Sequence, residues 1–374
     1  MIFVLVSVVA IALAYANGAN DNFKGVATLY GCGATNYRRA LIWATATTLL
    51  GSVAAVLLAG SLIKSFGGKG LIDDALVAEP AFASAVALGG GLTVLLATRL
   101  GMPVSTTHGL IGALLGTGLV AGSSMNLTTL GTKFVIPLLL SPFLAIFATG
   151  IIYPLLRFAR QRLGVTSEFC LCVGVKEVEV IPSTALNCQS IALEKSRQLT
   201  ISSGEKATCE SRYRGQVLGV DAETALNRGH FLSAGIVSFA RGLNDTPKIA
   251  ALLLLVPAFG PNVSLFAVGL AIAAGGWIAS RRVAETMSQR ITALNHGQGL
   301  TANVITGAIV IGASRLGLPV STTHVSCGSL FGIGAVTGGA RPKVVATILL
   351  SWIITLPMAG GLAAVSYLAI RSIT

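Results

Sequence analysis

The sequence predicts an all-α, polytopic membrane protein built from two related halves, and three observations carry this prediction. The mean hydropathy is +0.79, and only 11% of the 374 residues are charged, whereas a soluble domain has about 25% charged residues. The apolar residues gather in runs that approach the roughly 20 residues a membrane-spanning helix needs. Two polar motifs, one with Asn-Asp and one with Ser-Thr-Thr, each occur twice and in the same order.

Six apolar windows are the predicted membrane helices. They are Ile2 to Ala16, Leu41 to Ile63, Ala81 to Ala97, Phe134 to Leu156, Val263 to Ala279 and Val344 to Ile370. These windows lack the period-2 alternation of barrel strands and are longer than about 10 residues. The basic residues behind the net charge of +12 lie mainly between the windows. This distribution indicates anionic lipid headgroups as partners and argues against nucleic-acid binding.

The polar segment 157–228 divides the chain into an N-terminal transmembrane repeat, 1–156, and a C-terminal one, 229–374. The segment contains ten basic and eight acidic residues. Basic residues flank it closely, and the positive-inside rule therefore predicts that it is a small cytoplasmic domain. The alternation in "EVEVIP" and "KSRQLTISSGEK" predicts short strands within it.

The cysteines predict no transition-metal site. Four lie in the polar segment, at Cys170, Cys172, Cys188 and Cys209. Their spacing is weak for zinc, so reduced thiols are the preferred interpretation and a zinc site is the alternative. The remaining pair, Cys32 and Cys327, is interpreted as packing residues.

The two motifs reveal an internal duplication. The Asn-Asp motif is "ANGANDNFKG" at Ala16–Gly25 and "ARGLNDTPKI" at Ala240–Ile249, an offset of 224 residues. The Ser-Thr motif lies in "ATRLGMPVSTTHGLIGALLG" at Ala97–Gly116 and "ASRLGLPVSTTHVSCGSLFG" at Ala313–Gly332, an offset of 216. These longer stretches share thirteen of twenty residues. Each motif interrupts an apolar segment in both halves, so each repeat is predicted to contain a helix broken at the Asn-Asp motif. Broken segments at corresponding positions of two halves mark the binding sites of transporters.

The Ser-Thr motif predicts an anion site. Proline is tolerated at a helix start and Ser or Thr caps it, so a helix should begin inside each motif. The apolar tract after His108 reaches only about Val120, which predicts a re-entrant hairpin. Two facing helix N-termini with hydroxyl donors suit a tetrahedral oxyanion. The predicted donors are Ser105, Thr106, Thr107, Ser321, Thr322 and Thr323.

The Asn-Asp motif predicts a cation site. An ionisable residue inside a span costs at least about 2.5–3.5 kcal/mol and marks a functional pathway. Asp21 and Asp245 occupy equivalent positions, and carboxylates are hard oxygen ligands suited to Na⁺. Asn20 and Asn244 are expected to assist at both the cation and the anion sites. Predicted to lie around the sites are His108, His324, Lys24, Lys248 and Asn303.

Each assignment has alternatives. Both motifs can be read as helix caps at the membrane surface. Lys24 and Lys248 either neutralise the aspartates or reach the anion. An intramembrane hydrolase using Ser105 with His108, or Ser321 with His324, is disfavoured, because the whole arrangement is duplicated and no Gly-x-Ser-x-Gly elbow surrounds either serine. An anion channel is disfavoured because a channel does not need paired buried carboxylates.

With "GANDNFKG", "GLNDTPK" and "PVSTTH" in both halves, the chain resembles the inorganic phosphate transporter (PiT) family over nearly its whole length. This resemblance implies phosphate symport with Na⁺ or H⁺ through two inverted repeats and two hairpins. It implies that Asp21 and Asp245 are essential. The family often has Asn where Lys24 and Lys248 stand, and many members have Glu at the position of Asn303 and near Thr48.

We therefore expect a phosphate importer of the cytoplasmic membrane, not an enzyme, with about 12 membrane segments when hairpin arms are counted. Phosphate should lie between the two hairpin N-termini, and Na⁺ is the preferred coupling ion, with no other cofactor. H⁺ coupling, a passive anion channel and a sulfate permease are the alternatives. A homodimer is left open as the assembly.

Overall fold

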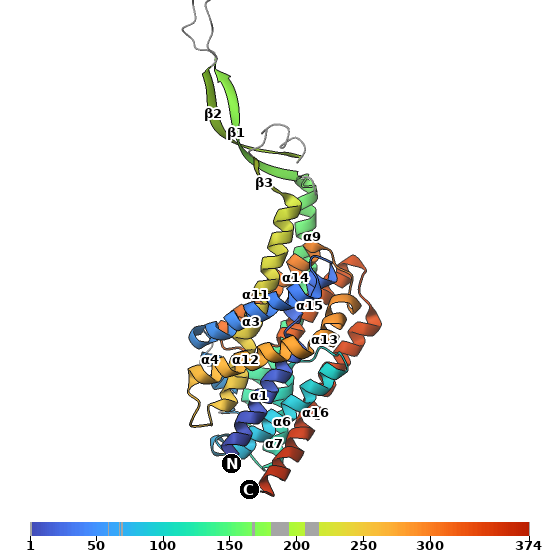
Figure 1. Cartoon of the computed structure of the whole chain (residues 1–374). Coiled ribbons are helices and arrows are strands. Elements are labelled where there is room, and N and C mark those ends of the chain that lie inside the picture. Colours follow the sequence, from blue (N-terminus) through green and yellow to red (C-terminus); the bar gives the residue numbers. More distant parts are fainter. Residues whose placement is uncertain are drawn as a thin grey trace, which may run out of the picture. The chain divides into compact units, whose positions relative to one another are not determined.

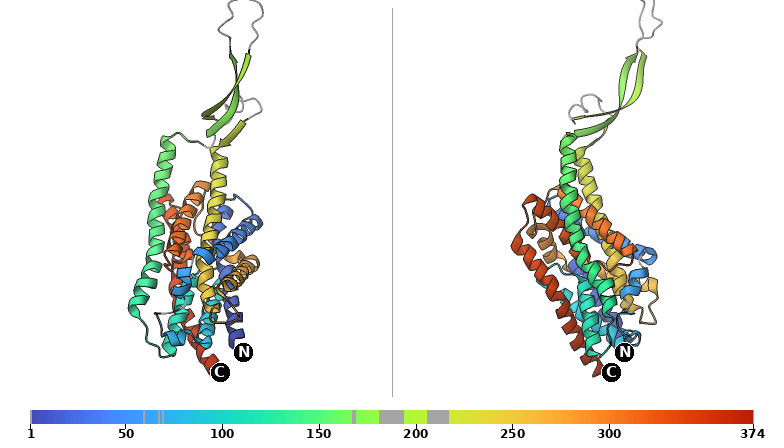
Figure 2. Two further views of the ribbon diagram at one scale, coloured as in Figure 1. Left: turned by 90° about the vertical axis from the view of Figure 1, so that its left-hand side faces the viewer. Right: turned by 180° about the vertical axis from the view of Figure 1, so that it is seen from behind.

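The computed structural model describes residues 2–58, 60–66, 68, 70–166, 169–180, 194–205 and 217–373. The chain divides into two compact units. The helical unit consists of Met1–Pro154 and His230–Thr374, and the smaller unit is Leu155–Gly229. Both chain ends lie at one end of the helical unit (Figures 1 and 2).

The helical unit confirms the predicted membrane helices. Its main helices are α1 (Ile2–Asp21), α2 (Ala27–Gly31), α3 (Tyr37–Leu58), α4 (Gly60–Phe66), α5 (Asp74–Val77), α6 (Pro80–Arg99), α7 (Thr106–Val120), α8 (Leu127–Thr129), α9 (Ile136–Arg162), α11 (Ala222–Leu253), α12 (Pro261–Ala279), α13 (Arg281–Glu285), α14 (His296–Arg315), α15 (Thr322–Thr337) and α16 (Pro342–Arg371). The other helical segments are the 3₁₀ turn η1 (Lys24–Val26) and the π-helical segments η2 (Leu130–Val135) and η3 (Thr286–Arg290). In the described part, six helical stretches are long and apolar enough to cross a bilayer, and each overlaps one predicted window.

Exposed apolar side chains cover the outer faces of the long helices. On α9, Phe143 is 55% and Phe147 65% exposed, and on α16 Ile353 is 71% exposed. Such faces are stable in lipid rather than in water. The chain is a multi-pass membrane protein.

Both Ser-Thr motifs start a helix, as predicted. The preceding helices α6 and α14 end in Schellman turns, in which Gly101 and Gly317 have φ of +69°. The amide of Met102 donates to Ala97 O at 2.9 Å, and that of Leu318 to Ala313 O at 2.9 Å. Glycine adopts this left-handed conformation without a Cβ penalty. The turn allows the chain to reverse within a few residues before α7 and α15 begin.

The Asn-Asp motifs differ from each other, and the prediction of two broken helices is half wrong. In the first, α1 ends at Asp21 and the chain continues through η1 into α2. In the second, α11 runs without interruption through Asp245 and contains Pro247. One local difference is that Gly25, a poor helix former, corresponds to the apolar Ile249, which is fully buried in the core.

The two halves pack together through direct contacts between a helix of one half and a helix of the other. A Cβ on Gly18 of α1 would lie 1.9 Å from Ile272 O of α12. At the equivalent position, a Cβ on Gly242 of α11 would lie 2.1 Å from Thr48 O of α3. Glycine therefore permits backbone contact between a helix of one half and a helix of the other.

The helices that follow the Ser-Thr motifs also contact a helix of the other half. A Cβ on Gly112 of α7 would lie 2.2 Å from Leu356 O of α16. A Cβ on Gly328 of α15 would lie 2.6 Å from Pro142 O of α9. Since Gly112 and Gly328 are 216 residues apart, the sequence duplication extends to matched packing contacts.

The smaller unit contains a three-stranded antiparallel sheet of order β2-β1-β3. Its strands are β1 (Phe169–Val180), β2 (Glu194–Glu205) and β3 (Val217–Asp221). The strand prediction is confirmed, with strands longer than expected, and the all-α class therefore applies to the helical unit. Of the cysteines predicted as free thiols, Cys188 and Cys209 lie outside the described residues.

Candidate anion and cation site

The N-termini of α7 and α15 meet in the interior of the helical unit. Thr107 Oγ1 donates to Val320 O at 3.4 Å, and Thr323 Oγ1 donates to Val104 O at 2.8 Å. All four residues are buried. Each helix start is thus bonded to the extended segment that precedes the other one. The predicted convergence of the two motifs is present in the fold.

The predicted serines act as helix caps. Ser105 Oγ accepts from the backbone N–H of His108 at 3.1 Å, and Ser321 Oγ from that of His324 at 3.2 Å. The backbone conformations agree closely, with φ/ψ of −96°/115° at Ser105 and −95°/115° at Ser321. Because the two imidazoles face each other, Nδ1 to Nε2 at 3.1 Å, the geometry gives no support to a Ser-His nucleophile.

Lys24 lies in a cage of oxygen atoms. Its ammonium forms an ion pair with the carboxylate of Asp21. It also donates to Asn20 Oδ1 at 2.8 Å, to Val104 O at 3.0 Å and to Thr323 Oγ1 at 2.6 Å. The threonine belongs to the other half of the chain. A single cation is therefore held by a carboxylate, an amide, a carbonyl and a hydroxyl oxygen.

Lys248 occupies the equivalent position in the second half. Its ammonium lies 3.2 Å from Asp245 Oδ1, and it donates to Val320 O and Thr107 Oγ1, both at 2.8 Å. Each lysine thus joins the aspartate of its own Asn-Asp motif to a threonine of the opposite Ser-Thr motif. Each ammonium is therefore placed to neutralise the aspartate of its own motif, which is one of the two roles considered for these lysines.

The two predicted asparagines brace the segments before the helix starts. Asn20 Nδ2 donates to Met102 O at 3.0 Å, and its Oδ1 accepts from the backbone of Val104 at 3.1 Å. Asn244 Nδ2 donates to Val320 O at 3.2 Å, and its Oδ1 accepts from Ser314 Oγ at 3.2 Å. These contacts position the carbonyls that hold the lysines.

The remaining threonines approach the carboxylates. Thr106 Oγ1 lies 3.5 Å from Asp21 Oδ2, and Thr322 Oγ1 lies 3.4 Å from Asp245 Oδ2. Asn17 links the two carboxylates: its Nδ2 lies 3.1 Å from Asp21 Oδ2 and 3.5 Å from Asp245 Oδ2. Asn17 was missed at the sequence level, although it stands in the motif itself.

A more informative residue that the sequence interpretation missed is Arg241. It is 1% exposed, and none of its three guanidinium nitrogens has a hydrogen-bond partner among the described residues. It aligns with Asn17 at the offset of 224 residues. The available signal was a cation inside an apolar span, which marks a functional position.

The buried charges concentrate in the two Asn-Asp motifs. In the described part of the chain, the buried Asp, Glu, Lys and Arg residues are Asp21, Lys24, Arg241, Asp245 and Lys248. Three formal positive charges stand against two negative ones, an excess of one. Since an uncompensated buried charge is strongly destabilising, an anion bound beside these groups would stabilise the site.

The outer predicted residues divide into two groups. His324 stacks on Trp352 with ring centroids 3.8 Å apart, and the indole donates to Pro103 O at 3.1 Å. The histidine pair is therefore linked through Trp352 to the segment that precedes α7. Asn303 instead contacts Thr28 at 2.9 Å and Ser233 at 3.3 Å. The structure does not bring Asn303 into contact with the helix starts.

Comparisons with known proteins agree with these features. The profile of the phosphate transporter family matches residues 17–363. A protein of Pyrococcus furiosus that carries the name of a phosphate permease is 28% identical, covering 99% of this chain and 96% of its own. The chloroplastic inorganic phosphate transporter 2-1 of Arabidopsis thaliana is 27% identical, with 94% and 69% covered.

A solved structure supports the fold. The structure described as the sodium-dependent phosphate transporter superposes with a TM-score of 0.76 at 22% identity, and both chains are covered completely. Together with the profile match, which includes both Asn-Asp motifs and both Ser-Thr motifs, this leads to one conclusion. The chain belongs to the phosphate transporter family.

Proposed function

We propose that this chain imports inorganic phosphate and that the anion binds between the N-termini of α7 and α15. The observation that carries the proposal is the buried guanidinium of Arg241, which has no hydrogen-bond partner among the described residues and supplies the one positive charge that the two Lys–Asp pairs leave unbalanced. A phosphate oxyanion supplies several acceptor oxygens, and Arg matches that geometry with two parallel hydrogen bonds. Monovalent dihydrogen phosphate would balance the excess charge.

The helix starts add donors to this site. Thr106, Thr107, Thr322 and Thr323 carry hydroxyls at two converging N-termini, where amide groups and the helix dipole favour an anion. Thr107 and Thr323 currently donate to backbone carbonyls of the opposite motif. Phosphate binding would exchange these carbonyl acceptors for phosphate oxygens. Ser105 and Ser321 contribute by fixing the helix starts.

We infer that Lys24 and Lys248 serve as built-in cations at the two positions where the sequence predicts sodium. Their ammonium groups have the oxygen partners that a sodium ion would otherwise take. An ammonium already paired with each carboxylate removes the need for Na⁺ as a counter-ion. A proton is then the coupling ion that remains of the two considered.

Sodium symport is the second candidate, because a structural neighbour is described as sodium-dependent. It requires Na⁺ to displace each lysine from Asp21 and Asp245, with Asn20 and Asn244 as further ligands. We also propose inverted repeats that rock against each other, about 12 membrane segments, a cytoplasmic 157–228 segment and residence in the cytoplasmic membrane. The glycine contacts between the halves support two equivalent repeats.

Labelled phosphate uptake into proteoliposomes tests this proposal. Uptake should respond to an imposed pH gradient and be indifferent to a Na⁺ gradient. The double variant K24N/K248N, which carries the residues common in the family, should gain a response to Na⁺. The exposed Lys64→Asn serves as the matched control. A response of the unmodified protein to Na⁺ alone restores sodium symport, and indifference to both gradients favours the channel.

A further inference from the structure

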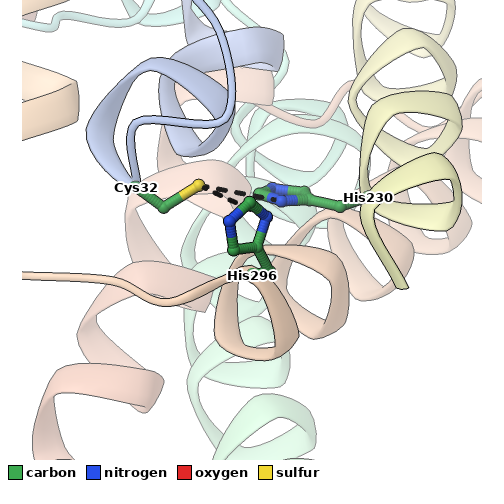
Figure 3. Close-up of side chains that lie close together, drawn as sticks. All are labelled: Cys32, His230 and His296. Carbon is green, nitrogen blue, oxygen red and sulfur yellow. Dashed lines mark hydrogen bonds between the residues drawn. The ribbon is translucent and has the colours of Figure 1, made fainter. Parts of the chain in front are cut away.

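A second polar cluster in the helical unit lies outside the anion site. Cys32 directly follows α2, His230 belongs to α11, and His296 is the first residue of α14. Figure 3 shows their side chains turned toward one another. We propose that these three residues bind one metal ion of the zinc class, at a site that joins the first half of the chain to the second.

The ligand atoms are close to the spacing of a metal site. Cys32 Sγ lies 3.9 Å from His230 Nδ1 and 4.0 Å from His296 Nδ1, and all three ligand atoms lie within 4.8 Å of one another. Zn–S and Zn–N bonds of about 2.3 and 2.05 Å at a tetrahedral angle place S and N about 3.5 Å apart. A closure of about half an ångström, within reach of side-chain torsions, brings each of the two sulfur–nitrogen distances to this value.

His230 is already oriented for coordination. Its Nε2 lies 3.0 Å from Thr28 Oγ1, and that hydroxyl lies 3.2 Å from Asn303 Oδ1. When Thr28 donates to Asn303, it accepts from the His230 Nε2–H, and the Nδ1 lone pair faces Cys32. A hydrogen bond from the second ring nitrogen is the usual support of a metal-bound histidine.

Gly299 gives the ring its space. A Cβ at this position would lie 2.4 Å from His230 Nε2, so any larger residue would displace the imidazole. His230 is fully buried, whereas Cys32 and His296 are half-buried. The site therefore combines a fixed inner ligand with two ligands that metal and water can reach.

The donor set selects the metal class. One thiolate and two imidazoles suit Zn²⁺ and other soft or borderline ions, whereas Mg²⁺ and Ca²⁺ prefer oxygen ligands. The Cys32 thiol gives up its proton to solvent on binding. Three protein ligands leave the fourth position for water. The bound ion would cross-link α2, α11 and α14 and so stabilise the helical unit in this conformation.

Metal binding to the purified full chain tests the proposal without any transport assay. After chelator treatment, Co²⁺ should bind with a thiolate-to-cobalt charge-transfer band, and Zn²⁺ should displace it and raise the melting temperature. To separate this site from cysteines of the polar segment, the measurement is made in a background with Cys170, Cys172, Cys188 and Cys209 changed to Ser.

In that background, C32S should abolish the band, and H296Q should weaken Zn²⁺ binding at least about tenfold. C327S, which removes a buried cysteine elsewhere, should keep both the band and the affinity. A band that persists in C32S, or a Zn²⁺-induced melting shift that is equal in C32S and the background protein, overturns the proposal.

Discussion

The two Asn-Asp motifs reach the same chemistry through different backbones. In the first half α1 ends at Asp21, and Lys24 begins a short 3₁₀ turn. In the second half Lys248 lies inside the continuous helix α11. Both ammonium groups nevertheless bind a carbonyl and a threonine of a Ser-Thr motif. The carbonyl belongs to the motif of the same half and the threonine to the motif of the other half, so the two helix starts together hold each cation, whether or not its own helix is broken.

A second difference lies one turn earlier, where Asn17 corresponds to Arg241. Asn17 is neutral and bridges Asp21 and Asp245. Arg241 is charged and lacks a hydrogen-bond partner in the described structure. The duplicated site is therefore symmetric in its carboxylates and lysines and asymmetric in this one charge. We expect the asymmetric residue to bind substrate and the symmetric ones to maintain the charge balance.

The largest effect is expected from removing the symmetric carboxylates. D21N and D245N each leave a buried ammonium without its counter-ion, which costs about 3–5 kcal/mol, and each should abolish phosphate uptake. Thermal unfolding in detergent and proteoliposome uptake measure the two effects. The double variants D21N/K24Q and D245N/K248Q remove both charges and should recover much of the stability without recovering uptake. Full uptake in either single variant removes that carboxylate from the mechanism.

The next effect tests the asymmetric residue. R241M should weaken phosphate binding by about 10- to 100-fold, since hydrogen bonds to charged groups contribute about 1.5–3 kcal/mol. Without phosphate it should melt no lower than the unmodified protein, because an unpaired buried charge is lost. Calorimetric phosphate titration and thermal unfolding measure both. The control N17L removes the equivalent neutral bridge. Equal loss of phosphate affinity in both variants would contradict the special role of Arg241.

Smaller effects are expected from substitutions at the glycine contacts between helices of the two halves. G18A and G242A place a methyl group 1.9 and 2.1 Å from carbonyl oxygens of the other half, and each should destabilise the protein by about 1–3 kcal/mol or more. G312A is the matched control, because its added Cβ meets no atom within 4 Å. If thermal unfolding finds the three alanine variants equally stable, the helices of the two halves do not make the close backbone contacts described.

The smallest effect should compare the helix caps. S105A and S321A each remove one cap, worth about 1 kcal/mol. Because the two caps agree in backbone angles and hydrogen-bond length, the losses of unfolding free energy should be nearly equal. S351A, a hydroxyl within α16 that bonds Ile348 O, is a non-cap control. Losses that differ by more than about twofold would show that the two helix starts are not equivalent.

Much of the fold could be predicted from local patterns. Apolar runs predicted six of the long helices, because a chain in lipid must satisfy its backbone within a helix, but they did not include the less apolar long helices α11 and α14. The "PVSTTH" stretches predicted helix starts at Thr106 and Thr322, because capping is a local interaction of Ser105 and Ser321. Alternation predicted strands in the polar segment. The break predicted in the second Asn-Asp motif was wrong, because α11 continues through Asp245 and Pro247, and a proline at that position gives no local signal for a continuous helix.

The sequence by itself determined the membrane class, the duplication and the residue types of the site, because periodicity, composition and capping act over a few neighbouring residues. Only the tertiary structure decided which partners those residues have. Lys24 meets Thr323, Lys248 meets Thr107, and Cys32 meets two histidines across distances of up to 299 residues in sequence. Such contacts depend on how helices of the two halves pack against each other at their glycines, and no local sequence pattern contains that information.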